Sequence, residues 1–367
     1  MISFANPSAQ FHSYKNKIEL AVLKVLRGNQ YILGKEVSSL EKEFADYLNI
    51  KSVIGVANGT DAIEIALRAL NIGQGDEVIT VSHTAVATVA AIEATGAKPV
   101  LIDVDKNFFT LDVSKLNKAI NPNTKAIIAV HLYGQSVDLD KISAFCKLNK
   151  VFLIEDVSQA HGGLWNEKKL GTFGIISCFS CYPTKNLGAL GDAGLIATNN
   201  ILLSKKIHKL REYGWKNRYI SEIKGRNSRL DEIQAAILRI KLKYLDKDNL
   251  KRKKIASIYI EGIKNSHIIL PSVREKADPV FHLFVIRTKF RDQLKKHLEK
   301  NGISTGIHYP VPIHLQKAYK NKIKIPADLK VTELLAKEVL SLPIFPELKI
   351  SDVKKVISVI NIFNPKL

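Results

Sequence analysis

The sequence predicts an α/β fold with a mainly parallel sheet that helices cover on both faces. Two observations support this prediction. Short apolar runs alternate with helix-like patterns over the first two-thirds of the chain, and polar residues directly follow several of the apolar runs. Parallel strands need crossover connections of about a dozen residues or more, and the expected helices supply them.

The expected elements follow one another in a regular order. Thr60 is the expected N-cap of a helix whose apolar residues recur at helical spacing up to Leu70. Gly73 and Gly75 then end that helix. The predicted strands are 77–81, 100–104, 126–130, 151–154, 175–180 and 193–198, and further helices are expected at 86–95 and 139–148.

The pattern changes after about residue 229. Helix-like segments at 229–244 and 250–263 are followed by a short strand at 283–287 and helix patterns at 291–301 and 331–340. We therefore expect a large domain over residues 1–245 and a smaller C-terminal α+β domain over residues 246–367.

Composition excludes several classes of protein. The chain has 367 residues, 46% of them hydrophobic and 25% charged, so it is neither a disordered polar chain nor a collagen-like repeat. The formal net charge of +20 is compatible with nucleic acid, an anionic membrane or an anionic small molecule as partner. The excess is denser in the last third, but no nucleic-acid-binding motif accompanies it. We interpret it mainly as a solvated basic surface.

The cysteines indicate a reducing compartment. Cys146, Cys178 and Cys181 do not form a disulfide framework, and the single Cys-x-x-Cys pair has no second pair for a metal, so we expect cytoplasmic localisation and no metal site. No apolar run is long enough to span a membrane, and no signal peptide is evident.

Three polar segments follow predicted strands, where ligands bind in open α/β sheets. The turn Asn58-Gly59-Thr60 opens a helix, so it is either a phosphate-binding helix start or a plain N-cap. Asp156 follows a buried strand and is a candidate base, metal ligand, partner of a cationic ring nitrogen, or simple cap. Ser180 ends another apolar run.

Lys185 is the main catalytic candidate. It lies in a loop between two predicted buried strands, flanked by Gly188, Gly191 and Gly194. Desolvation lowers the pKa of such a lysine and allows Schiff-base chemistry. Together with Asp156 and the Gly59-Thr60 turn, it forms a set that fits pyridoxal phosphate.

At this point the sequence resembles the DegT/StrS sugar aminotransferases, which have the type I (aspartate aminotransferase) fold, and the resemblance runs nearly end to end. The motifs that carry it are GKEV at 34–37, NGTDAIEIAL at 58–67, EDVSQAHGG at 155–163, CFSCYPTKNLGALGDAG at 178–194, GRNSRLDEIQAA at 225–236, HYPVPIHLQ at 308–316 and SLPIFPEL at 341–348.

The resemblance implies a role for each matching residue. Lys185 would bind the cofactor aldehyde and move the substrate proton, and Asp156 would keep the pyridine nitrogen protonated. The remaining implied cofactor contacts are Gln159 to the phenolic oxygen, Gly59, Thr60 and Ser180 to the phosphate, and Asn227 to the phosphate of the neighbouring subunit. That last contact implies a homodimer with shared active sites.

One segment departs from the family pattern. Ala85 stands where many members have an aromatic residue that stacks on the pyridine ring, and His83 is the substitute we consider. The candidate substrate contacts are His161, Tyr182, His308 and Tyr309.

The resemblance implies transfer of an amino group from L-glutamate to a nucleotide-linked keto-sugar, by way of pyridoxamine phosphate. Family members with histidine in place of Lys185 are dehydratases, so transamination is favoured. The segment 83–100 most resembles enzymes that convert a dTDP-3-keto-6-deoxyhexose into a 3-amino-3,6-dideoxyhexose for surface glycans such as the O-antigen of lipopolysaccharide. The alternatives are a UDP- or GDP-linked 4-keto sugar as substrate, and a DNA-binding regulator that shares the fold.

Overall fold

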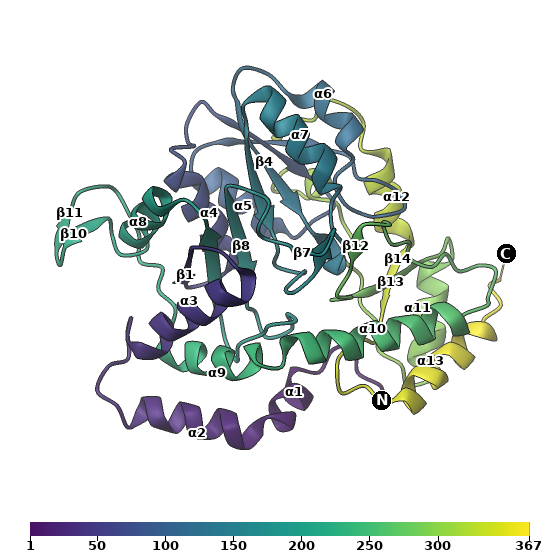
Figure 1. Ribbon diagram of the computed structural model, residues 1–367. Helices are drawn as coiled ribbons and strands as arrows, with labels where there is room; N and C mark the ends of the chain where they lie inside the picture. Colours follow the sequence, from purple (N-terminus) through teal and green to yellow (C-terminus); the bar gives the residue numbers. More distant parts are fainter. Residues whose placement is uncertain (367) are drawn as a thin grey trace.

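A seven-stranded sheet organises the larger part of the chain in this computed structural model, which describes residues 1–366 (Figure 1). The strand order is β1-β9-β8-β5-β4-β2-β3, and the neighbours from β8 to β3 pair in parallel. β9 is antiparallel to both of its neighbours. The predicted mainly parallel α/β sheet is confirmed. The strands are β1 (Ser52–Val56), β2 (Glu77–Val81), β3 (Lys98–Ile102), β4 (Thr124–Val130), β5 (Phe152–Asp156), β8 (Ile176–Ser180) and β9 (Gly194–Thr198).

Helices cover the sheet because its strands are apolar on both faces; all five residues of β2, for example, are buried. α4 packs on β8 and β9, α5 on β3, and α7 on β5, while α3 lies on β1 and carries α9 and α2 outside it. The helices before residue 245 are α1 (Pro7–Ser13), α2 (Lys15–Leu26), α3 (Lys35–Leu48), α4 (Gly59–Ala69), α5 (Val86–Ala94), α6 (Leu116–Ala119), α7 (Leu139–Asn149), α8 (Ile201–Leu210) and α9 (Glu232–Leu242).

Two small sheets flank the main one. β6 (Leu164–Trp165) pairs with β7 (Lys168–Lys169) and with β12 (Ala277–Asp278), which comes from the C-terminal part of the chain. β10 (Trp215–Asn217) and β11 (Ile220–Ser221) form a hairpin that projects from the large domain beside α8 (Figure 1).

The smaller domain has its own apolar core. β13 (Phe284–Arg287) pairs antiparallel with β14 (Val339–Leu342). The core also contains Ile2, so the first residues of the chain pack with the C-terminal part. Three helices pack around this core: α10 (Leu245–Gly262), α11 (Arg291–Lys300) and α13 (Ile350–Asn361). α12 (Lys330–Glu338) instead packs through Leu335 with the core of the large sheet.

Several boundaries differ from the expected ones. The helix predicted at 331–340 ends at Glu338, and β14 begins directly after it, because Val339–Leu342 is a fully buried apolar run. The two helices expected at 229–244 and 250–263 are α9 and α10, which a short turn at Lys243 and Tyr244 separates. The domain boundary near residue 245 stays a prediction.

Candidate active site

A cavity of about 570 Å³ lies beyond the carboxyl ends of β5 and β8, where the start of α4 meets a loop from the smaller domain. This is the edge at which open α/β sheets bind ligands. Its lining comes from both parts of the chain and includes Asn58, Gly59, Thr60, Ala85, Thr88, Asp156, Gln159, Ser180, Tyr182, Lys185, His282, His308 and Tyr309.

Lys185 reaches this cavity from the loop between β8 and β9. Its backbone N–H donates a 2.8 Å hydrogen bond to the carbonyl of Tyr182, which fixes the turn that carries it. Burial lowers the pKa of the Lys185 amine to about 8, although the negative charge of Asp156 acts in the opposite direction. At pH 7 about a tenth of this amine is therefore uncharged and nucleophilic, far more than of an ordinary lysine.

Asp156 is the last residue of β5, and its side chain faces the cavity. One carboxylate oxygen accepts a 3.1 Å hydrogen bond from the N–H of Ser158, and the other lies 3.4 Å from the hydroxyl of Thr88. Glu155 precedes it on the same strand, so its side chain lies on the opposite face of the sheet. Asp156 is therefore the carboxylate of this pair that can pair with a cationic ligand.

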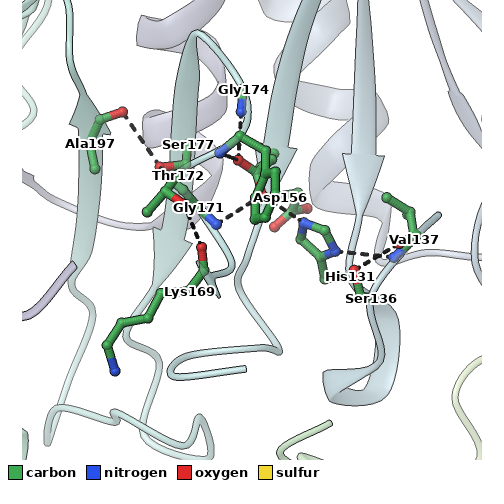
Figure 2. Close-up of polar contacts among 12 residues, drawn as sticks. His131, Ser136, Val137, Asp156, Lys169, Gly171, Thr172, Gly174, Ser177 and Ala197 are labelled. Atoms are coloured by element: carbon green, nitrogen blue, oxygen red, sulfur yellow. Dashed lines mark hydrogen bonds and ion pairs between the residues drawn. The ribbon is translucent and has the colours of Figure 1, made fainter. Parts of the chain in front are cut away.

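Glu155 anchors the turn that leads into β8. It is fully buried, and its carboxylate accepts hydrogen bonds of 2.7–2.8 Å from the N–H groups of Gly171, Phe173 and Gly174. His131 Nε2 lies 3.1 Å from the same carboxylate (Figure 2). Burial alone would raise the pKa of Glu155, but the hydrogen bonds from His131 and the turn outweigh it and hold that pKa below its ordinary value.

Gln159 presents its amide nitrogen to the cavity. Its Oε1 accepts a 2.7 Å hydrogen bond from the backbone N–H of Tyr133, and its Nε2 lies 3.2 Å from the hydroxyl of Tyr309. Because a backbone N–H can only donate, the orientation of this amide is fixed. One N–H of Gln159 therefore remains available for an acceptor on a ligand.

The start of α4 lies against the end of β8. The N-cap is Asn58 and not Thr60 as expected, because the Asn58 side chain accepts a 2.8 Å hydrogen bond from the N–H of Asp61. Gly59 packs so closely that a Cβ there would meet the Cβ of Ser180 at 2.6 Å. Thr60 and Ser180 both line the cavity, so free N–H groups and two hydroxyls surround one small space.

His83 is not among the residues that line the cavity, and its stacking role stays a prediction. Its Nε2 lies 2.8 Å from the hydroxyl of Tyr133, which in turn donates to the carbonyl of His308. These contacts direct the ring into the core, and burial lowers the pKa of His83 to about 4. Ala85, the position at which the family pattern has an aromatic residue, lines the cavity.

The other predicted residues divide into two groups. Tyr182, His308 and Tyr309 line the cavity. His161 is fully buried against Phe179, with a ring-centroid distance of 5.5 Å, and is not part of the lining.

Asn227 and the cysteines also lie apart from this cavity. Asn227 is exposed and forms a β-bridge with Glu212 outside the cavity of its own chain. Cys178 and Cys181 are buried free thiols, and residues 1–366 contain no group of three or more potential metal ligands.

The residues near the site that were not predicted include Thr88, Tyr133 and His282. Tyr133 has a left-handed backbone (φ 62°), which turns its N–H toward Gln159. His282 directly precedes the Leu283–Arg287 segment and lines the cavity. A single histidine before a strand carries no signal in the sequence, so only the assembled fold reveals it.

The residues fit the phosphorylated pyridine aldehyde that the sequence suggested. A nucleophilic amine, a carboxylate, a fixed amide donor and a helix start without a Cβ at Gly59 surround one cavity. These groups match the aldehyde, ring nitrogen, phenolic oxygen and phosphate of pyridoxal phosphate.

Comparisons with known proteins agree with this arrangement. The model of the DegT/DnrJ/EryC1/StrS aminotransferase family matches residues 12–361. The chain is 46% identical to the dTDP-3-amino-3,6-dideoxy-alpha-D-galactopyranose transaminase of Aneurinibacillus thermoaerophilus, over 95% of each chain.

Two solved structures are also similar. DesV of S. venezuelae, described in complex with a ketimine intermediate, has a TM-score of 0.96 and 41% identity, with 98% of this chain and 97% of that chain covered. NtdA of Bacillus subtilis, described with bound cofactor PMP, has a TM-score of 0.87 and 32% identity, with 95% and 82% covered.

Proposed function

The chain belongs to the DegT/DnrJ/EryC1/StrS aminotransferase family, and from this premise we propose that it converts a dTDP-linked 3-keto-6-deoxyhexose into the corresponding 3-amino-3,6-dideoxyhexose. It is a transaminase that depends on pyridoxal phosphate. One observation supports the proposal most directly: Lys185, whose pKa is lowered, and Asp156 line the same cavity.

Each half of the reaction requires a proton transfer at the carbon that loses or receives the amino group. When bound, pyridoxal phosphate takes up the electron pair that remains after this carbon loses its proton. The Asp156 carboxylate would hold the pyridine N–H, and the free N–H of Gln159 would donate to the phenolic oxygen. The N–H groups of Gly59 and Thr60, with the Ser180 hydroxyl, would bind the phosphate.

Lys185 is the proposed base and acid. With a pKa of about 8, its Nζ would take the proton from the α-carbon of the amino donor and hold it for the later return step. L-Glutamate is the proposed donor. The keto-sugar then accepts the amino group while the same nitrogen moves the proton in the opposite direction.

The sugar would bind at the outer part of the cavity. Tyr182 is half exposed there, and His308 and Tyr309 contribute polar groups from the smaller domain. The similarity to a dTDP-3-amino-3,6-dideoxyhexose transaminase supports a dTDP-linked 3-keto substrate. The product would serve surface glycans, such as the O-antigen of lipopolysaccharide.

A homodimer with shared active sites is part of the proposal. Asn227 lies outside the cavity of its own chain. Its bridge partner Glu212 shortly precedes β10, and the β10–β11 hairpin projects from the rest of the fold (Figure 1). Asn227 would contact the phosphate bound by the second subunit. The three free thiols support a reducing, cytoplasmic location. Among the described residues, no helix has the length and apolarity needed to cross a bilayer.

The test begins with the visible absorbance of the purified protein loaded with pyridoxal phosphate. L-Glutamate should bleach the band of the wild-type protein, and Lys185→Ala should not bleach at a comparable rate. The bleached protein is then mixed with dTDP-3-keto-6-deoxyhexose, or with UDP- and GDP-linked 4-keto sugars for comparison. Recovery of the band by the dTDP sugar alone supports the proposal. Recovery only by a 4-keto sugar, or no bleaching, contradicts it.

A further inference from the structure

A loop of the smaller domain contributes one wall of the cavity, and two consecutive residues of the large sheet hold its two ends. The loop spans residues 308–314, and its first two residues, His308 and Tyr309, line the cavity. Ser82 and His83 directly follow β2, and each is only 1% exposed. No step of the proposed chemistry uses the hydroxyl of Ser82 or the imidazole of His83.

The first end of the loop is held through Tyr133. Its hydroxyl donates to the carbonyl of His308, and Nε2 of His83 lies 2.8 Å from the same hydroxyl. Because a carbonyl can only accept, the single hydroxyl proton is used there, and the hydroxyl oxygen accepts from Nε2 of His83. Burial lowers the pKa of His83 to about 4, so the ring is neutral and carries its one proton on Nε2. Two hydrogen bonds in series, each of which strengthens the other, therefore join the end of β2 to the loop.

The second end of the loop is held by Ser82. Its carbonyl accepts from the N–H of Ile313 at 3.4 Å, and its hydroxyl oxygen accepts from the N–H of His314 at 3.3 Å. The same hydroxyl lies 2.7 Å from Nδ1 of His314, whose Nε2 lies 3.2 Å from the Glu333 carboxylate. Because a carboxylate can only accept, a neutral imidazole here donates through Nε2, and its Nδ1 accepts the proton of the Ser82 hydroxyl.

Tyr309 lies between these two attachments. Its hydroxyl lies 3.2 Å from Nε2 of Gln159, on the side of the cavity proposed for the cofactor. Within residues 1–366, no hydrogen bond joins Lys185 or Asp156 to the loop 308–314. A shift of the loop would therefore move the wall against which the sugar is proposed to bind, and it would leave the lysine and the carboxylate in place.

We propose that Ser82 and His83 are positioning residues for the sugar half of transamination. They would hold the loop 308–314, and with it the wall of the keto-sugar site. His83 would act through the Tyr133 hydroxyl, and Ser82 would act directly on the loop. The inference rests on the proposed function for its catalytic meaning, but the hold on the loop is testable without cofactor or substrate.

The first test compares the two half-reactions in His83→Leu and His83→Gln. Leucine removes the donor to the Tyr133 hydroxyl, whereas the terminal NH₂ group of glutamine can replace it. His83→Leu should raise the KM for dTDP-3-keto-6-deoxyhexose about tenfold, the effect of losing one hydrogen bond. The rate at which L-glutamate bleaches the cofactor band should stay within about twofold of the wild type, because Lys185 and Asp156 do not move. His83→Gln should recover most of the wild-type KM.

Tyr133→Phe tests whether His83 acts through the hydroxyl. This variant already breaks the connection to the loop, so adding His83→Leu should raise the KM for the keto-sugar no further. Independent, additive effects of the two substitutions would contradict the proposed route. The matched control is His208→Leu, because His208 is a half-buried histidine on α8, which packs on β1 and β9. It should leave both half-reactions unchanged.

Amide hydrogen exchange of the cofactor-free protein tests the hold on the loop alone. The N–H groups of Ile313 and His314 are bonded to Ser82, so Ser82→Ala should speed exchange in peptide 308–316 about five- to tenfold. His83→Leu should speed exchange in the same peptide, and His83→Gln should stay close to the wild type. The paired strands β13 and β14 of the smaller domain are the internal control and should exchange equally in all variants.

The outcomes separate the inference from the proposed function. Equal loop exchange and equal keto-sugar KM in the wild type, His83→Leu and Ser82→Ala would overturn the inference. Loss of affinity for pyridoxal phosphate in His83→Gln as large as in His83→Leu would also overturn it, since it would indicate ring stacking by His83. If His83→Leu does not fold, Ser82→Ala and Tyr133→Phe provide the same comparisons. A wild type that transfers no amino group to any keto-sugar, with the expected exchange pattern, would contradict the proposed function alone.

Discussion

The backbone N–H of Tyr133 donates a 2.7 Å hydrogen bond to Oε1 of Gln159. This contact fixes the orientation of the Gln159 amide, so its NH₂ group faces the cavity. With its oxygen occupied, the amide has only N–H groups left to offer. One of them faces Tyr309 at 3.2 Å. The other is the proposed donor to the phenolic oxygen of the cofactor.

Gln159→Glu should therefore weaken cofactor binding. A carboxylate cannot donate, and it would repel an anionic phenolic oxygen. We expect the affinity for pyridoxal phosphate to fall about ten- to hundredfold, the equivalent of one hydrogen bond to a charged group. Absorbance titration of cofactor-free protein measures this. Tyr309→Phe removes only the neighbouring hydroxyl and is the matched control. Equal affinity in Gln159→Glu and the wild type would contradict the assigned orientation.

The charge of Asp156 should be visible in the titration of Lys185. Burial lowers the pKa of Lys185 to about 8, and Asp156 opposes this by stabilising the ammonium form. Removing that negative charge must therefore lower the midpoint further. Reductive methylation with labelled formaldehyde, followed against pH by peptide mass spectrometry, measures the Lys185 midpoint. We expect a midpoint near 8 in the wild type and a lower one in Asp156→Asn. The control variant Asp112→Asn removes a carboxylate from a different groove and should leave the Lys185 midpoint unchanged. A midpoint above 8 in Asp156→Asn would reverse the sign and contradict the assigned contact.

A substitution of Gly59 would test the proposed phosphate site, because its effect on binding would come from steric packing and not from a change of charge. A methyl group at this position would meet the Cβ of Ser180 at 2.6 Å, closer than side chains approach one another. Gly59→Ala must therefore push the start of α4 away from β8. We expect at least about tenfold weaker binding of pyridoxal phosphate. Adding Ser180→Gly removes the atoms that clash and should recover part of the loss. Unchanged affinity in Gly59→Ala would show that the phosphate binds elsewhere.

Much of the sheet could be predicted because its strands are continuous apolar runs bounded by glycine or polar residues. The segment 77–81 is the clearest example, and β2 has these bounds. β1 (Ser52–Val56) was missed because it follows Lys51 and contains Gly55, which weakens the strand signal. The helix expected at 331–340 continues into a strand because one apolar pattern serves both elements.

Site residues at the ends of strands could be predicted from the sequence. The orientation of a side chain, toward the cavity or toward the core, could not. Lys185 and Asp156 line one cavity because parallel strands end at one edge. His83 also follows a strand, but its ring turns into the core toward Tyr133. His282 reaches the site from the smaller domain, and no local pattern marks such a long-range contact.

Glu155 should contribute to stability in a way that depends on pH. Its carboxylate accepts three backbone hydrogen bonds and a fourth from His131. The N–H of Val137 donates to Nδ1 of His131 at 3.3 Å, which leaves Nε2 to donate to the Glu155 carboxylate (Figure 2). Glu155→Gln would place an amide N–H against these donors. We expect a loss of about 3 kcal/mol or more in the free energy of unfolding at pH 7.

The sign of the pH effect follows from the lowered pKa of Glu155. A carboxylate whose pKa is lower in the folded state stabilises the protein above its unfolded pKa, and this stabilisation disappears as the pH falls through the folded value. The gap in stability between the wild type and Glu155→Gln should thus be full at pH 7 and shrink below about pH 4.5, the ordinary value. Urea unfolding followed by circular dichroism at several pH values measures it. Glu19→Gln, in an exposed pair with Lys15, should change stability by less than about 1 kcal/mol. A gap that widens in acid would mean that Glu155 is protonated in the native protein.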